Sequence, residues 1–364
     1  MERKSPITRR GFVQLSSGLL VTSISNATAR TEPGVSRPTN SDLVGLTGKI
    51  VLEEHFDFSG TEKSSYASFG GPEFQQQIRD LSSGRLAEMD RGGIEVSILS
   101  LVGPGIQAIL NSAQAIEVAR RANDHLAESI AKNPKRLKGF AALALQDPNA
   151  AAQELTRCTK ELGFCGGLVN GFTQTDDGTT MFYDMPQYRD FWATVQQLDV
   201  PFYLHPRSAL PAHQPAYQGH AWLTGSIWGF TAETSIHALR LMGSGLFDDY
   251  PKLKIILGHL GEGLPCSIWR IDNRVSRTLQ DRPKAKRPIG HYFRENFYIT
   301  TSGNFRTQTL TEVMLEVGPD RILYSVDYPF EDTQLAADWF DHAAISDADR
   351  LKIGRTNAQK LFRL

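Results

Sequence analysis

From Lys49 onward, short apolar segments alternate with amphipathic ones, and this alternation limits the chain to a few folds. Eight of the apolar segments have the length of strands. Several of them are nearly continuous in apolar residues, as strands buried on both faces are. They cover residues 49–56, 94–101, 137–145, 166–171, 200–206, 253–259, 297–302 and 321–327. Helical periodicity fills most of the intervals, for example over 113–131 and 185–198.

Eight strands separated by helices predict an α/β fold, and they favour a closed parallel (β/α)8 barrel over an open sheet. An open, doubly wound sheet is the alternative. However, the sequence has no GxGxxG after an early strand and no GxxxxGK[ST], so the usual nucleotide-binding motifs are absent. One domain is predicted over residues 48–364. The stretch 208–230 is rich in Gly, Pro and aromatic residues, and we expect it to form a loop over the barrel mouth.

Residues 1–29 are predicted to be an export signal of the twin-arginine type. Basic residues come first, a weakly apolar stretch follows, small residues end the segment, and TRRGFV (8–13) resembles the twin-arginine motif. The apolar stretch is too short and too polar for stable membrane insertion. The expected location is therefore periplasmic or secreted, and a cytoplasmic protein with a basic tail is the alternative. Residues 30–47, rich in Pro, Ser, Thr and Gly, are predicted to be a linker.

The charge balance excludes the usual signature of a nucleic-acid-binding protein, which carries a basic excess. The chain has 39 basic and 40 acidic residues among 364. Removal of residues 1–29 would take away four basic residues and one acidic residue, and it would leave a mildly acidic domain. The three cysteines, Cys158, Cys165 and Cys266, are too few for a disulfide scaffold. A bridge between Cys158 and Cys165 is neither assumed nor excluded.

Residues suited to binding a metal stand at the ends of four predicted strands. Glu53 and His55 end the first strand on one face, because side chains alternate along a strand. His205, His259 and Asp327 end the fifth, sixth and eighth strands. Any one of them alone could be an ordinary hydrogen-bonded residue. Because the carboxyl ends of all barrel strands meet at one rim, the five together predict a site for a divalent ion.

The segments LEEHF, YLHPR, GHLGEGLP, ENFYITTSGNF and ILYSVDYPFE carry a family resemblance. In this order they resemble the amidohydrolase-related decarboxylases, in the branch of 2,3-dihydroxybenzoate and 2,6-dihydroxybenzoate (γ-resorcylate) decarboxylases. The resemblance runs from about Lys49 to Leu364. It implies a barrel of the metal-dependent hydrolase type, one divalent ion, Zn²⁺ or Mn²⁺, and no organic cofactor. It further implies a carboxy-lyase that releases CO₂ from a small hydroxylated benzoate without oxidation, and a homodimer or homotetramer.

The resemblance also implies roles for individual residues. The implied metal ligands are Glu53, His55, His205 and Asp327. The predicted catalytic residues are Asp327, His259 and Glu262. Arg270, which matches a polar residue of the family, is a predicted substrate contact, and so is Phe330, one of the aromatic residues expected at the barrel mouth. Asp327 is expected to protonate the ring carbon that bears the carboxylate, and Glu262 is expected to orient His259 or relay its proton. The export signal departs from the family pattern, in which the members are cytoplasmic.

A metal-dependent hydrolase of a lactone, ester or amide on the same barrel is the alternative function, with Asp327 as general base. Hydrolases of this superfamily favour His-x-His in the first strand and often a lysine after the fourth. This chain has Glu-x-His in the first position, and its fourth strand reads GGLVNG. An inactive binding protein would be expected to have lost ligands, whereas this chain retains all five candidates.

Overall fold

The structure is a computed structural model that describes residues 45–58, 70–210, 212–277 and 280–364. Eight parallel strands form one sheet in the order β1-β2-β3-β4-β7-β8-β9-β10, so each strand lies beside the next one along the barrel. The strands are Lys49–Phe56 (β1), Ile94–Leu101 (β2), Leu137–Ala142 (β3), Gly166–Asn170 (β4), Phe202–His205 (β7), Ile255–Leu257 (β8), Phe297–Thr300 (β9) and Ile322–Leu323 (β10). The predicted eight-stranded α/β barrel is confirmed.

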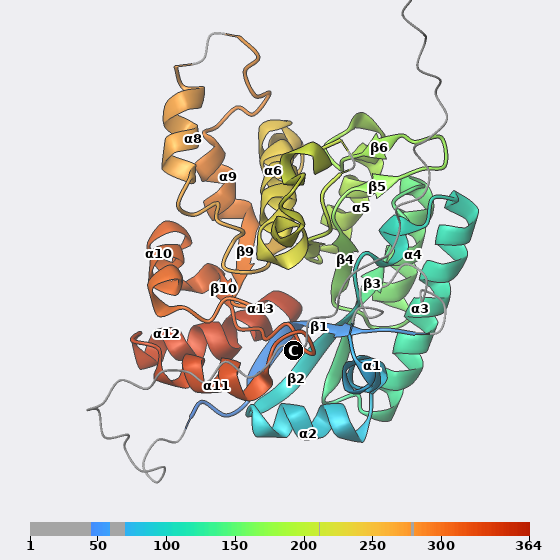
Figure 1. Cartoon of the computed structure of the whole chain (residues 1–364), viewed down its shortest axis with the longest axis vertical. Helices are drawn as coiled ribbons and strands as arrows, with labels where there is room; N and C mark the ends of the chain where they lie inside the picture. The colour runs from blue at the N-terminus through green and yellow to red at the C-terminus, as the bar shows by residue number, and fades with distance from the viewer. Residues whose placement is uncertain (1–44, 59–69, 211, 278–279) are drawn as a thin grey trace, which may run out of the picture. The chain divides into compact units, whose positions relative to one another are not determined.

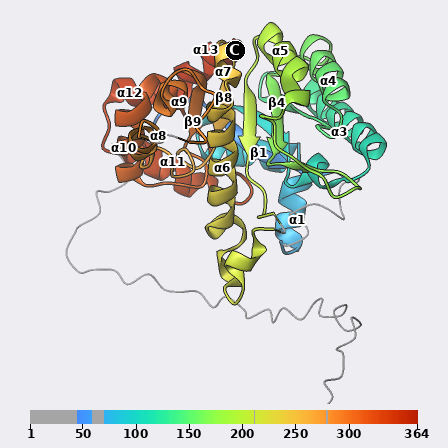
Figure 2. The same ribbon diagram turned by 90° about the horizontal axis from the view of Figure 1, so that it is seen from above.

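Helices surround the strands (Figure 1). Seen from above, α3, α4 and α5 lie on one side of the strands and α9 to α12 lie on the other (Figure 2). The helices are Pro72–Arg79 (α1), Ser83–Arg91 (α2), Ser112–Lys132 (α3), Pro148–Lys160 (α4), Arg189–Leu198 (α5), Gly229–Gly243 (α6), Leu246–Asp249 (α7), Ile268–Val275 (α8), Ile289–Asn296 (α9), Thr307–Val317 (α10), Thr333–His342 (α11), Asp347–Leu351 (α12) and Asn357–Phe362 (α13). A small antiparallel pair, Thr173–Gln174 (β5) and Thr180–Met181 (β6), follows β4.

Local signals explain where the longer helices start. The side chain of Asn111 accepts a hydrogen bond from the Gln114 amide (2.9 Å) and caps α3. Asp147 caps α4 in the same way, with Pro148 at the first helical position, where its missing N–H costs nothing. The predicted loop 208–230 contains three short 3₁₀ helices, at Gln214–Tyr217, Ala221–Leu223 and Gly225–Ile227, and ends at the start of α6.

The barrel interior is filled by apolar side chains from every strand. One buried cluster contains residues of β1, β2, β3, β4, β7, β8 and β10, with Tyr298 of β9 packed against it. Ala358, Leu361 and Phe362 of α13 belong to the same cluster. Helix α13 is the helix of the described residues that contributes to this interior cluster. It therefore covers one end of the barrel, the end opposite the rim that carries the predicted ligands.

A β-bulge in β1 decides which of its side chains face inward. Ile50 and Leu52 belong to the interior cluster, and strict alternation would then point Glu53 outward. The register of β1 against β2 is irregular between Val51 and Glu54. The amides of both Leu52 and Glu53 donate to the Ser325 hydroxyl, at 3.0 and 2.7 Å. The extra residue at this bulge turns Glu53 inward together with His55.

The ends of the sheet meet without a regular ladder. The His55 amide donates to the Tyr328 carbonyl oxygen (2.8 Å), so the chain after β10 is joined to the end of β1. The predicted export signal (1–29) and most of the predicted linker (30–47) lie outside the described residues. None of the helices in the described part of the chain is long and apolar enough to cross a membrane. Cys158 and Cys165 are both free thiols.

Candidate metal centre

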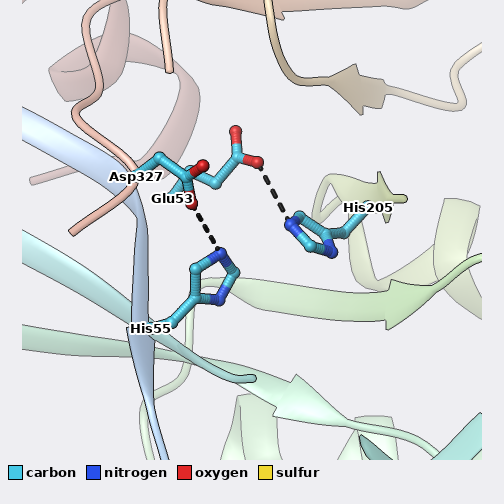
Figure 3. A group of neighbouring side chains, drawn as sticks. All are labelled: Glu53, His55, His205 and Asp327. Carbon is cyan, nitrogen blue, oxygen red and sulfur yellow. Dashed lines mark ion pairs between the residues drawn. The ribbon is translucent and has the colours of Figure 1, made fainter. Parts of the chain in front are cut away.

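Four side chains from three parts of the barrel meet at its rim (Figure 3). One candidate ligand atom from each of Glu53, His55, His205 and Asp327 lies within 4.8 Å of the other three. His55 Nε2 is 3.1 Å from Asp327 Oδ1, and His205 Nε2 is 3.3 Å from Glu53 Oε1. Ligands at about 2.1 Å from one ion are at most about 4.2 Å apart, so small shifts would bring all four onto a single ion.

Three of these residues present a buried polar atom that has no hydrogen-bond partner among the described residues. These atoms are Glu53 Oε1, His55 Nε2 and Asp327 Oδ1. Buried polar atoms are rarely left without a partner, because desolvation without compensation is costly. Two carboxylate oxygens and two imidazole nitrogens form a donor set that both Zn²⁺ and Mn²⁺ accept. The residues therefore fit a divalent ion, as the sequence predicts.

The other oxygen of Glu53 is held by three hydroxyl groups. Tyr203 and Ser302 each donate a short hydrogen bond to Glu53 Oε2, and Thr300 donates a third at 3.1 Å. Glu53 itself is completely buried. With Oε2 occupied in this way, only Oε1 is directed toward the other ligands. The hydroxyl groups thus orient Glu53 as a ligand through one oxygen.

Both candidate histidine ligands are oriented through their second ring nitrogen. His205 Nδ1 donates to Asn170 Oδ1 (2.7 Å), which leaves Nε2 to face Glu53. His55 Nδ1 lies 3.2 Å from the Ser100 hydroxyl, and its Nε2 faces Asp327. Contacts of this kind fix the ring and its tautomer, and they are typical of histidines that bind metals.

The electrostatics around His205 and Asp327 favour the protonation states that a metal requires, whereas burial raises the pKa of Glu53. Burial lowers the pKa of His205 well below its usual value, and the neighbouring His55 lowers it further, so its imidazole is neutral. Burial alone would raise the pKa of Asp327, but His259 and His55 hold it below the usual range. A neutral imidazole and an ionised carboxylate are the forms that coordinate a cation.

His259 lies beside the four ligands in a tight turn after β8. Its Nε2 is 3.6 Å from Asp327 Oδ2, and its Nδ1 is 2.8 Å from Glu262 Oε1. The Glu262 carboxylate is also held by the Thr231 hydroxyl (2.9 Å). Burial alone would lower the pKa of His259, yet the carboxylates of Glu262 and Glu53 raise it well above its usual value. His259 therefore carries a proton next to Asp327.

The backbone at this centre is strained. His259 (φ 53°), Glu262 (φ 55°) and Asp327 (φ 81°) are non-glycine residues in the left-handed region. Each such residue costs on the order of 1–3 kcal/mol and persists only where its surroundings hold it. Gly303 (φ 60°) lies next to two of these residues. A Cβ at this position would lie 3.0 Å from His259 Cδ2 and 3.5 Å from Asp327 Oδ2. A glycine at this position leaves the approach to both residues open.

A cavity of about 430 Å³ opens above the metal centre, a size common for small-molecule sites. His205, His259 and Asp327 lie at its polar end, and Phe330 and Glu331 follow Asp327 along its wall. The remaining lining residues come from the end of β2 and the segment 208–230: Gly103, Ser208, Thr224, Gly225, Ser226, Ile227 and Phe230. The segment 208–230 therefore forms part of the cavity, in agreement with its predicted place at the barrel mouth.

The structure brings together most of the predicted site residues. Phe330 lies in the cavity wall, with its ring centroid 5.7 Å from that of His55. Arg270 lies on α8 and is exposed, away from the residues that line the cavity of this chain. Its role as a substrate contact stays a prediction. Glu262 contacts His259, as expected, across a tight turn in which both residues have a left-handed backbone.

Several residues of the centre carry no recognisable signal in the sequence. They are Asn170, Tyr203, Thr300, Ser302, Gly303 and Glu331. Tyr203, Thr300, Ser302, Gly303 and Glu331 all belong to the segments YLHPR, ENFYITTSGNF and ILYSVDYPFE, which carry the family resemblance. Their individual roles could not be predicted, because each depends on a contact with a strand distant in sequence.

Comparison with known proteins places this barrel in a family. A family model for amidohydrolases matches residues 82–364. The chain belongs to the amidohydrolase family. Within that family, a γ-resorcylate decarboxylase from Polaromonas sp. JS666 is 58% identical over 328 residues, which cover 88% of this chain and 99% of that protein.

Two solved amidohydrolase-fold structures support the same assignment. A 2,6-dihydroxybenzoate decarboxylase complexed with 2,6-dihydroxybenzoate is 56% identical, with a TM-score of 0.84, and covers 88% of this chain and 100% of that chain. A dihydroxybenzoic acid decarboxylase from Polaromonas sp. JS666, with bound manganese and the inhibitor 2-nitroresorcinol, is 57% identical, with a TM-score of 0.85. It covers 88% of this chain and 98% of that chain. The resemblance to the γ-resorcylate branch is confirmed, and these relatives favour the decarboxylase over the hydrolase alternative.

Proposed function

We propose that this protein is a carboxy-lyase that removes CO₂ from a 2,6-dihydroxybenzoate-like acid without oxidation. The observation that carries the proposal is the meeting of Glu53, His55, His205 and Asp327 below a cavity of about 430 Å³. Relatives at 58% and 56% identity are γ-resorcylate and 2,6-dihydroxybenzoate decarboxylases, which supports the same substrate class.

The reaction replaces one substituent of the ring. The bond between the ring and the carboxylate breaks, CO₂ leaves, the electron pair stays on the ring carbon, and one proton takes the vacant position. A divalent ion held by the four ligands would supply a Lewis acid for the substrate carboxylate and its ortho hydroxyl. Phe330 places an aromatic side chain in the cavity wall, as expected for a cavity that binds an arene.

His259 and Asp327 are placed to move the proton. Asp327 Oδ2 lies 3.6 Å from His259 Nε2 and is within reach of a ligand in the cavity that both residues line. The electrostatics described above put the proton on His259 and leave Asp327 ionised. We therefore infer that Asp327 delivers to the ring carbon a proton that it takes from His259, while Glu262 keeps that imidazole charged and oriented.

The ion in this chain is proposed to be Mn²⁺. Manganese is bound in the related decarboxylase from Polaromonas sp. JS666. Glu53 and Asp327 supply two hard carboxylate oxygens, which Mn²⁺ favours, while His55 and His205 keep Zn²⁺ a competitor. Metal analysis of the purified protein, expressed with both metals supplied, distinguishes the two.

A substrate panel tests the proposed reaction. Purified Mn²⁺-loaded protein is incubated with 2,6-dihydroxybenzoate, 2,3-dihydroxybenzoate, salicylate and 4-hydroxybenzoate, and CO₂ release is measured. We expect turnover of the 2,6-dihydroxy acid, and no turnover of 4-hydroxybenzoate, which lacks an ortho hydroxyl. Hydrolysis of a lactone or ester panel by protein that decarboxylates none of the acids would replace this proposal with the hydrolase alternative.

Substitution of Glu262 by Gln should lower kcat/KM at neutral pH by about 10- to 100-fold. Glu262 raises the pKa of His259, so its neutral replacement lowers that pKa. The proton on His259 is then lost at a lower pH, and the alkaline limb of the kcat/KM profile should move toward acidic pH. The matched control is Glu316→Gln, because Glu316 is paired with Arg294 away from the cavity. An unshifted profile in Glu262→Gln would contradict this role.

Export and assembly are proposed on separate grounds. The twin-arginine-like segment TRRGFV supports export to the periplasm, and N-terminal sequencing of protein recovered from that compartment tests it. Trp222 and Trp269 are large apolar side chains that are 61% and 74% exposed, and they are candidates for contact with a partner subunit. We propose a homodimer or homotetramer, and light scattering of the purified protein should give two or four times the mass of one chain.

A further inference from the structure

Glu54 is a buried acidic residue of the LEEHF segment that the metal centre does not use. Its side chain is on the outer face of β1, since Glu53 and His55 both point inward, and the residue is only 3% exposed. A carboxylate in such a place must be satisfied by hydrogen bonds or opposite charge. The hydrogen bonds of Glu54 indicate its structural role.

The hydrogen bonds of Glu54 surround the ligand Asp327. Glu54 Oε1 accepts from the Ser325 hydroxyl (3.1 Å) and from the Val326 amide (3.0 Å). Glu54 Oε2 accepts from the Tyr328 amide (3.3 Å). The donors stand two residues before, one before and one after Asp327, whose backbone is in the left-handed region at φ 81°. The Glu54 carboxylate therefore binds the chain on both sides of Asp327, whose backbone conformation is rare for an aspartate.

Arg85 of α2 contacts the same two chain segments, the end of β1 and the turn that contains Tyr328. It is 2% exposed, and its guanidinium donates to the carbonyl oxygens of His55 (2.6 Å) and Asp80 (2.8 Å). The guanidinium carbon also lies 4.9 Å from the centre of the Tyr328 ring. Burial raises the pKa of Glu54 to about 8, and the positive charge of Arg85 acts in the opposite direction and favours the carboxylate. Arg85 thus contacts the end of β1 and the turn after β10 at the same time.

We propose that Glu54 and Arg85 form a clamp outside the barrel that positions Asp327 and His55 for the ion. The clamp links the two chain segments that supply three of the four ligands, at the place where β10 and β1 share no regular ladder. Glu54 is in this view a positioning residue, which acts through Asp327 and touches neither ion nor substrate. The proposal rests on the metal centre of the proposed function, but not on the identity of the substrate.

The test measures Mn²⁺ affinity of the full chain by competition with a fluorescent chelator, together with the thermal midpoint of the metal-free protein. Glu54→Gln keeps the size of the side chain but presents an amide nitrogen to one of the backbone donors. We expect its dissociation constant for Mn²⁺ to rise about 10- to 100-fold. The control is Asn357→Ala, which removes two buried hydrogen bonds, to Pro319 and Ile322, at the other end of β10. It should lower the thermal midpoint and leave Mn²⁺ affinity within about twofold of the wild type.

Three results would overturn the clamp. One is a folded Glu54→Gln protein with wild-type Mn²⁺ affinity, and another is a loss of affinity in Asn357→Ala equal to that in Glu54→Gln. If Glu54→Gln does not fold, Arg85→Lys carries the same test, because a lysine lacks the two separate nitrogens with which Arg85 donates to His55 and Asp80. Wild-type affinity in that variant is the third result. Wild-type protein that binds Mn²⁺ but decarboxylates no acid would remove the proposed substrate and leave the clamp standing. Wild-type protein that binds no Mn²⁺ would remove both.

Discussion

Replacement of Asp327 by Asn is expected to lower kcat for decarboxylation by at least about 10³-fold. Asp327 contributes a buried oxygen to the metal centre, and it lies beside His259 at the polar end of the cavity. An amide can neither deliver the proton nor supply the same charge to the ion, and loss of a general acid alone costs about 10²- to 10⁴-fold. The measurement is CO₂ release at saturating substrate and saturating Mn²⁺.

The metal content separates the two roles of Asp327. If Asp327→Asn still holds about one ion per chain, the loss of rate is due to the proton step; if it holds none, the loss begins with the ligand. Asp332→Asn is the matched control. Asp332 caps α11 by accepting from the Leu335 amide, and asparagine caps a helix equally well. An Asp327→Asn protein that retains a tenth or more of the wild-type kcat would exclude Asp327 as the proton donor.

Removal of the ion by a chelator should abolish activity, by about 10³-fold or more, and Mn²⁺ should restore it at about one ion per chain. The physical reason is the set of buried atoms without hydrogen-bond partners on Glu53, His55 and Asp327, which a divalent cation would satisfy together. The same set predicts a loss of stability. A ligand at 100 times its dissociation constant stabilises a protein by about 2.7 kcal/mol, so the metal-free protein should melt several degrees lower.

The control for this experiment is Glu53→Gln, treated in the same way. Its neutral amide weakens the binding of the ion, so Mn²⁺ at the concentration that reactivates the wild type should restore little activity. Full activity of wild-type protein that holds less than a tenth of an ion per chain would show that the reaction does not need the centre. Calorimetry, with and without Mn²⁺, measures the change in melting temperature.

The sequence predicts the barrel because each strand has its own local pattern of apolar residues. A continuous apolar run marks a strand buried on both faces, and the helices between the strands repeat with a period near 3.6. Strands β1 and β2 match their predicted limits, Lys49–Phe56 and Ile94–Leu101. The eighth strand was predicted over 321–327, yet only Ile322–Leu323 pair regularly. After Leu323, the chain bonds to side chains and to β1 instead of continuing the ladder.

The bulge in β1 illustrates why part of the metal centre could not be predicted from the sequence. Alternation correctly puts Glu53 and His55 on one face, but it does not show that this face is the interior, because Ile50 and Leu52 would then point outward. The hydroxyl of Ser325, some 270 residues further along the chain, binds the amides of both Leu52 and Glu53 and accommodates the extra residue. Such a contact leaves no periodic mark in either segment.

The sequence by itself determined the kind of barrel, the set of candidate ligands and the chemistry those ligands suit, since residue types and strand ends are local properties. Only the tertiary structure decided which atoms are left without partners, how Glu262 reaches His259, and that Arg270 lies outside the cavity of its own chain. Glu54 is an example of a role that the sequence does not show. It stands beside two ligands in the sequence, yet its hydrogen bonds are with residues 325–328. Its role follows from the closure of the barrel, which joins the first strand to the last.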